Sequence, residues 1–175
     1  ALLAGASSPG HASGVGTAAI QLCKQQGNPV FVTVGDPAKL EFCRQLGASA
    51  GHVRTQGDFE SAVKEWSGGE GVHAILDPVG GNYLEQNVRL LATDGSLVII
   101  GLMGGRSAAL DIGRLLIKRI RVIGSTLRSR SNADKAILTT GVATGDLIAP
   151  MMALVAKGGR GVVTAVAPIS QEDVK

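Results

Sequence analysis

Aromatic residues, cysteines and histidines are all scarce in this sequence of 175 residues. Only 3% of the residues are aromatic, so the sequence lacks the ring platforms on which single-stranded nucleic acid stacks. The two cysteines, Cys23 and Cys43, form no C-x-x-C pair, and the three histidines show no metal-ligand spacing. We therefore expect reduced, buried cysteines, no metal site and no nucleic-acid partner.

Long hydrophobic runs are also missing. No stretch approaches the roughly 18 consecutive apolar residues of a transmembrane helix, and no charged-then-apolar leader opens the chain. We therefore expect a cytoplasmic protein with no membrane partner. The chain begins without methionine and already reads as a strand at 1–4, which favours an excised, engineered or trimmed piece.

Glycine and aliphatic residues are abundant instead. The 25 glycines indicate tight turns or backbone that approaches a ligand closely, and a hydrophobic content of 45% indicates a packed domain. A core of Ala, Val, Leu and Ile suits a buried parallel sheet covered by helices. The net charge of +3 includes a basic cluster within 118–130, which we interpret as a solvated helix end and loop.

Strand and helix patterns alternate along the whole chain, and no long linker divides it. The predicted strands are 1–4, 30–34, a weak one near 52–53, 72–76, 96–101, 120–124, 135–140 and 161–166. The predicted helices are 15–26, 36–47, 58–66, 83–92, 111–119 and 146–157. This alternation predicts a single domain, 1–175, built on a doubly wound parallel α/β sheet.

Helix 15–26 is predicted to bury one apolar face, made of Val15, Ala18, Ala19, Leu22 and Cys23. Before it lies a glycine-rich turn at 5–16 that leads from the first strand. In that position the backbone N–H groups of Ser13, Gly14 and Val15 could bind a diphosphate at the helix N-terminus. The domain is therefore expected to be Rossmann-like and to bind a dinucleotide.

The blocks SGVGTAAIQLCK, KLEFCRQLGA, GGEGVHAILDPVGG and GRLLIKRIRVIGSTLRSR carry a family resemblance. Together with the sequence between them, they resemble the quinone oxidoreductase branch of the medium-chain dehydrogenase/reductase superfamily over about residues 11–130. The resemblance implies a zinc-independent, NADP(H)-binding Rossmann domain. It also implies that a GroES-like catalytic domain, outside these 175 residues, completes the cleft in which hydride passes to a quinone or enone.

The cofactor's adenosine end is expected after the second predicted strand. Gly35 leaves room there for a 2′-phosphate, the resemblance places Lys39 near it, and Arg54 could assist. Asp36 argues for NAD(H), although its main role is predicted to be the N-cap of helix 36–47. We favour NADP(H) over NAD(H).

The nicotinamide end is expected after strand 96–101. The resemblance places the backbone of Gly101, Leu102 and Met103 along the nicotinamide, and Val79 beside the middle of the cofactor. For Asp77, which precedes Pro78, a turn is the favoured interpretation. We identify no catalytic acid, base or nucleophile.

Residues 132–175 depart from the family pattern. They resemble the fourth strand, helix and fifth strand of the zinc alcohol dehydrogenase branch, and 136–164 repeats the pattern of 74–100. Generic similarity between βαβ units and recombination both explain the repeat, so an engineered or recombined Rossmann-like fold without activity stays an alternative. We expect the unit 135–166 to extend the sheet at an exposed edge, with homodimerisation through that edge if it stays uncovered.

Overall fold

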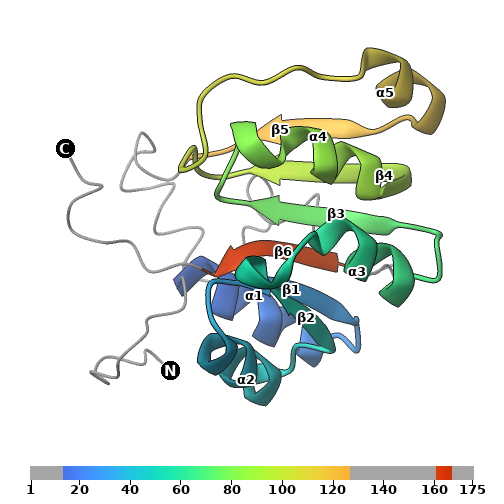
Figure 1. Ribbon diagram of the computed structural model, residues 1–175. Helices are drawn as coiled ribbons and strands as arrows, with labels where there is room; N and C mark the ends of the chain where they lie inside the picture. The colour runs from blue at the N-terminus through green and yellow to red at the C-terminus, as the bar shows by residue number, and fades with distance from the viewer. Residues whose placement is uncertain (1–13, 127–160, 167–175) are drawn as a thin grey trace, which may run out of the picture.

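A parallel β-sheet runs through the computed structural model, which describes residues 14–126 and 161–166 (Figure 1). Its six strands lie in the order β2-β1-β6-β3-β4-β5, and every neighbouring pair is parallel. The strands are β1 (Val30–Val34), β2 (Ala50–Val53), β3 (Val72–Asp77), β4 (Leu91–Ile99), β5 (Arg121–Gly124) and β6 (Gly161–Val166). The predicted doubly wound, Rossmann-like α/β fold is confirmed. The strands predicted at 1–4 and 135–140 and the helix predicted at 146–157 lie outside the described residues.

Helices cover both faces of the sheet (Figure 1). They are α1 (Gly14–Gln25), α2 (Pro37–Leu46), α3 (Phe59–Trp66), α4 (Gly81–Leu90) and α5 (Ile112–Lys118), with a short 3-10 turn η1 at Arg54–Gln56. One core layer joins α1 and α2 to the sheet and consists of aliphatic residues and the two cysteines. The other layer joins α3, α4 and α5 to the sheet. It contains four of the chain's five aromatic residues, paired as Phe31–Trp66 and Phe59–Tyr83.

Three aspartates fix where helices begin, as their positions in the sequence indicate. The side chain of Asp36 accepts a hydrogen bond from Lys39 N at the start of α2, where Pro37 is the first helical residue. Asp58 accepts from two backbone N–H groups at the start of α3, and Asp111 accepts from one at the start of α5. A short polar side chain at the N-cap satisfies helical N–H groups that have no partner within the helix.

The buried face of α1 differs from the predicted one. Ala19 and Cys23 are buried as predicted, and Ile20, which the predicted face did not include, is buried as well. Val15 is 42% exposed and Ala18 is also exposed. Two of the five predicted positions are therefore wrong. The helix is apolar on nearly every side at its start, so the sequence periodicity left its orientation undecided, and contact with β1 and β6 determines it.

The boundary between α4 and β4 also differs from the prediction of a helix over 83–92 and a strand over 96–101. The helix ends at Leu90, and Leu91 already pairs with Val72 of β3. The strand register then shifts, because Ala74 of β3 pairs with Ser96 of β4. β4 therefore has additional residues between Leu91 and Ser96, and one of them, Asp94, adopts a positive φ of 62°. The apolar pattern of Leu91 and Ala92 predicts that they belong to the helix, but pairing with β3 and burial make them part of β4.

The placement of β6 corrects the expectation that the C-terminal unit extends the sheet at an edge. β6 lies in the middle, where Val163 pairs with Val32 on one side and with Leu76 on the other. A central strand of a parallel sheet has both rows of its backbone groups paired, and the mostly apolar sequence GVVTAV is typical of such a strand. An edge position would have left one row of these groups unpaired.

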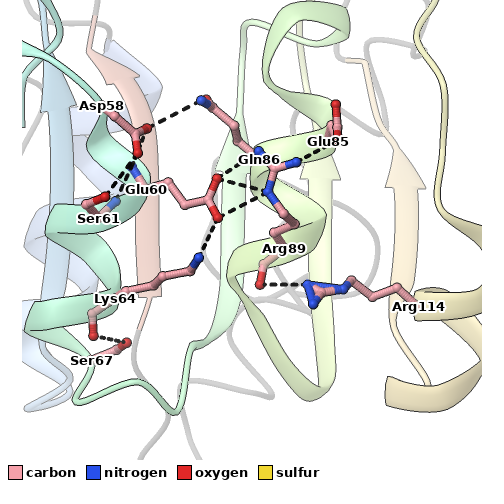
Figure 2. A network of polar contacts seen from close by, with 9 residues as sticks. All are labelled: Asp58, Glu60, Ser61, Lys64, Ser67, Glu85, Gln86, Arg89 and Arg114. Carbon is pink, nitrogen blue, oxygen red and sulfur yellow. Dashed lines mark hydrogen bonds and ion pairs between the residues drawn. The ribbon is translucent and has the colours of Figure 1, made fainter.

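A polar network fastens α3, α4 and α5 together, and Figure 2 shows its central part. Glu60 of α3 accepts hydrogen bonds from Arg89 of α4 and pairs with Lys64 one helical turn away. Arg114 of α5 donates to the Arg89 carbonyl, and Lys118 donates to the Leu91 carbonyl. These two cations satisfy carbonyls at the C-terminal end of α4, where the helix dipole is negative.

Candidate functional site

The carboxyl ends of the strands form the edge where an open parallel α/β sheet binds its ligands. There β1 continues into Gly35, β2 into Arg54, β3 into Pro78, and β4 into a loop through Gly101–Gly105. Val34 is the last residue of β1 and pairs with Val53, the last residue of β2. Gly35 and Arg54, which follow them, are therefore neighbours. Most of the predicted site residues therefore gather along one edge.

The N-terminus of α1 belongs to the same edge. The helix ends only a short turn before β1 begins, so the two run in opposite directions and α1 starts at the carboxyl ends of the strands. A helix of this length spans about 18 Å, which matches the roughly 17 Å of β1. Gly14 is the first residue of α1 and Val15 is partly exposed, whereas Ser13 lies outside the described residues.

Two loops at this edge are joined by backbone hydrogen bonds. Gly104 N donates to Val79 O at 2.7 Å, and Gly81 N donates to Gly105 O at 3.0 Å. Gly80 adopts a positive φ of 77°, and a Cβ placed on Gly101 would lie 2.5 Å from Pro78 O. The close approach of the loops thus requires glycine at both positions. This pairing of loops was not predicted, although the doublets Gly80-Gly81 and Gly104-Gly105 in the sequence could have indicated it.

The side chains at these loops divide into an exposed and a buried group. Leu102 and Met103 are each 52% exposed, which leaves apolar surface on the outer side of the loop. Val79 is buried, and its N–H and carbonyl are both used within the protein. Asp77 is fully buried, and its carboxylate accepts hydrogen bonds from Val79 N, Gly80 N and Asn87 Nδ2. The turn interpretation of Asp77 is therefore correct, and Asn87 is a partner that the sequence did not reveal.

Gly35 and Arg54 meet at the ends of β1 and β2. A Cβ placed on Gly35 would lie 3.3 Å from Arg54 Nη2, so the guanidinium group lies directly beside the glycine. The Nε atom of Arg54 is buried and has no hydrogen-bond partner among the described residues. A buried donor without a partner is unfavourable, and an acceptor on a bound ligand would satisfy it.

Asp36 and Lys39 form an ion pair next to Gly35. Lys39 Nζ lies 3.2 Å from Asp36 Oδ2, with the lysine side chain mostly buried and the aspartate side chain 44% exposed. The hydrogen bond from Lys39 N, together with the nearby ammonium group, lowers the pKa of Asp36 below its ordinary value. Asp36 is thus ionised at neutral pH and holds Lys39.

Neither a metal-binding cluster nor a membrane-spanning helix is found in the described ranges. Within residues 14–126 and 161–166, no three His, Cys, Asp or Glu side chains are grouped to bind a metal ion. No helix of this part of the chain is long and apolar enough to cross a membrane.

Comparison with known proteins gives the same family at the level of sequence and fold. A family model described as zinc-binding dehydrogenase matches residues 14–140. Quinone oxidoreductase-like protein 2 of Rattus norvegicus is 31% identical over 115 residues, which cover 66% of this chain and 33% of that protein. A spectinabilin polyketide synthase system protein of Streptomyces orinoci is 38% identical over 100 residues, 56% of this chain and 4% of its own length.

Among solved structures, the quinone oxidoreductase of Escherichia coli complexed with NADPH superposes with a TM-score of 0.64 and 25% identity. That match covers 84% of this chain and 43% of the other. The chain thus spans about a third of the length of the rat relative and under half of the bacterial enzyme. The chain belongs to the zinc-binding dehydrogenase family, in the quinone oxidoreductase branch of the medium-chain dehydrogenase/reductase superfamily.

Proposed function

We propose that this chain is the nicotinamide dinucleotide-binding domain of a zinc-independent oxidoreductase. When bound, the reduced cofactor NADPH would supply hydride to a quinone or enone, once a catalytic domain completes the cleft. The observation that carries the proposal is the gathering of the α1 N-terminus, Gly35, Arg54 and the two glycine loops at one sheet edge. The E. coli relative of similar fold was solved with NADPH.

The residues present fit such a cofactor in three respects. Gly35 leaves open a place that any side chain would fill, and Arg54 offers a buried N–H without a partner beside it. The amino end of α1 supplies backbone N–H groups and a positive dipole end for a diphosphate. A phosphate on the adenosine ribose would give Arg54 its missing acceptor, and for this reason we favour NADP(H) over NAD(H).

The domain's own contribution is to bind and orient the cofactor, since the cofactor carries the redox chemistry. The loop at Gly101–Met103 would lie along the nicotinamide, and its exposed Leu102 and Met103 would exclude water from one side of the ring. Val79 would contribute through backbone position, because its side chain is buried under Gly104. No described residue is assigned a proton-transfer role.

Titration calorimetry of the isolated chain with NADPH and NADH tests the proposal. We expect weak binding of NADPH, and its loss in Gly14→Leu, because the first turn of α1 must stay open for the diphosphate. Ala18→Leu is the matched control, since Ala18 is exposed on the same helix and should leave binding unchanged. Absence of binding by both cofactors at millimolar concentration would refute the proposed function.

A second candidate, a recombined Rossmann-like fold without activity, is favoured by one observation. In a doubly wound sheet, the strand that precedes α1 normally occupies the central position beside β1. In this chain that position is occupied by β6, which comes from the far end of the sequence. An assay of NADPH oxidation with a quinone can exclude this second candidate, but a negative result does not distinguish the two candidates. Turnover by the isolated chain would contradict this candidate and also the need for a catalytic domain.

We also propose homodimerisation through the β5 edge of the sheet. β5 is the last strand on that side among the described residues, and α5, which directly precedes it, exposes Ile112, Leu116 and Ile117 to more than 70% each. A second copy would cover this apolar surface and pair with the open strand. Light scattering after size exclusion that gives a monomer mass at high concentration would contradict it.

A further inference from the structure

We propose that Arg54 distinguishes NADP(H) from NAD(H) by binding the 2′-phosphate beside Gly35, while Asp36 weakens that binding by holding Lys39. The inference rests on the proposed function and assigns its specificity to particular residues. It concerns three charged side chains at the ends of β1 and β2. The three side chains differ in the ion pairs and hydrogen bonds that they already form within the protein, and this difference gives them different roles.

The two cations at this place differ in their partners. Lys39 is already paired, because its Nζ lies 3.2 Å from Asp36 Oδ2 and its side chain is mostly buried. Arg54 takes part in none of the ion pairs found among the described residues, and its buried Nε has no acceptor there. Arg54 is therefore the cation with unused hydrogen-bonding capacity.

The chemistry of a phosphate monoester matches that capacity. Its oxygens can accept two parallel N–H bonds from the planar guanidinium group, which a lysine ammonium cannot provide. The ribose 2′-hydroxyl of NAD(H) carries no charge and offers one oxygen, so it gains much less from Arg54. Because Gly35 has no side chain, the approach to Arg54 Nη2 from the β1 side stays open.

Asp36 acts in the opposite direction. Its carboxylate stays ionised, caps α2 through Lys39 N and neutralises Lys39. A phosphate dianion arriving beside Gly35 would meet this negative charge and would compete with it for Lys39. The same carboxylate can accept a hydrogen bond from a ribose hydroxyl, which favours NAD(H). The site should therefore accept both cofactors, with a moderate preference for the phosphorylated one.

Calorimetric titration with adenosine 2′,5′-bisphosphate and adenosine 5′-monophosphate tests the inference without an activity assay. Arg54→Gln should weaken the bisphosphate about tenfold or more and leave the monophosphate within about twofold. Arg54→Lys should fall between, because it keeps the charge and loses the fork. Arg44→Gln is the matched control, an exposed arginine of α2 whose nearest carboxylate is 3.9 Å away.

Asp36→Asn tests the second half of the inference. Asparagine caps a helix as well as aspartate does, so α2 should keep its start while Lys39 is released. We expect bisphosphate affinity to rise about threefold to tenfold, with no rise for the monophosphate. Glu41→Gln, which removes an exposed carboxylate from the same helix, should raise neither. Circular dichroism and thermal midpoints of all variants establish that they are folded.

The outcomes separate the two proposals. If the unmodified chain binds neither NADPH nor NADH, the proposed function fails and this inference fails with it. If both cofactors bind and Arg54→Gln leaves their affinity ratio unchanged, only the assignment of Arg54 is overturned. If Asp36→Asn lowers bisphosphate affinity, the opposing role of Asp36 is overturned.

Discussion

Replacing Glu60 by glutamine should loosen the junction between α3 and α4 (Figure 2). The Glu60 side chain is only 10% exposed, and its Oε2 accepts hydrogen bonds from Arg89 Nε at 2.9 Å and Nη2 at 2.8 Å. Lys64 Nζ lies 2.7 Å from the other oxygen. Glutamine has nearly the same shape, but it is neutral and presents N–H groups where one of these donors now points. The variant therefore removes charge and acceptor capacity without opening a cavity.

The expected loss of stability depends on which hydrogen bonds and ion pairs of Glu60 are removed and on how far water replaces them. A hydrogen bond to a charged group contributes about 1.5–3 kcal/mol when buried, and a surface ion pair contributes about 0–1 kcal/mol. Arg89 is 35% exposed and keeps Glu85 as a second partner at 2.6 Å, while Lys64 is 54% exposed. Water can thus partly satisfy both cations in the variant. We expect a loss of about 2 kcal/mol in the free energy of unfolding.

Urea denaturation followed by circular dichroism measures this loss, and a thermal midpoint lowered by about 4–8 °C should accompany it. Glu85→Gln is the control, because Glu85 pairs with the same arginine but is 73% exposed, so it should change stability by less than about 0.5 kcal/mol. Equal effects of the two substitutions, or a Glu60→Gln effect below about 0.5 kcal/mol, would refute the argument from burial.

The pH dependence of the same variant gives an independent check. The hydrogen bonds from Arg89, helped by those from Lys64, lower the pKa of Glu60 in the folded protein despite opposing desolvation. A lowered pKa means that Glu60 stabilises the fold above its unfolded pKa of about 4.3, and that this part is lost as pH falls through the folded value. The difference in unfolding free energy between the unmodified chain and Glu60→Gln should therefore be full at neutral pH and shrink below about pH 4.

Three further predictions address the loops, the core and the sheet. Gly101→Ala should destabilise the chain by about 1–3 kcal/mol in urea denaturation, because the added Cβ would lie 2.5 Å from Pro78 O. Gly124→Ala is the control and should change stability little, because its Cβ would meet no described atom within 4 Å. Equal effects of the two substitutions would contradict the predicted crowding at Gly101. Cys43 should resist alkylation at pH 8 in the native chain and react after unfolding, because burial raises the pKa of its thiol to about 11; rapid native labelling would contradict this. Val163→Pro should abolish the cooperative urea transition, since β6 lies between β1 and β3; a variant that still unfolds cooperatively would show that β6 is not the central strand.

Local features of the chain were predictable because they depend on neighbours in sequence. Asp36, Asp58 and Asp111 each cap a helix using N–H groups two or three residues away. The β-branched run at β1 was recognised as a buried strand for a similar reason. The sequence also predicted Gly35 and Arg54 as site residues, because each follows a predicted strand, but only the structure shows that the two lie side by side.

Tertiary structure decided the features that depend on distant parts of the chain. Glu60 and Arg89 are 29 positions apart, and nothing local to either residue indicates that they meet. Leu91 joins a strand because Val72 lies beside it, and the buried face of α1 follows from the sheet beneath the helix. The position of β6 is the clearest example of a feature that the local sequence does not determine. Its mostly apolar sequence favours a place within a sheet, but several strand positions meet that requirement, and only the packing of the whole sheet selects the one between β1 and β3.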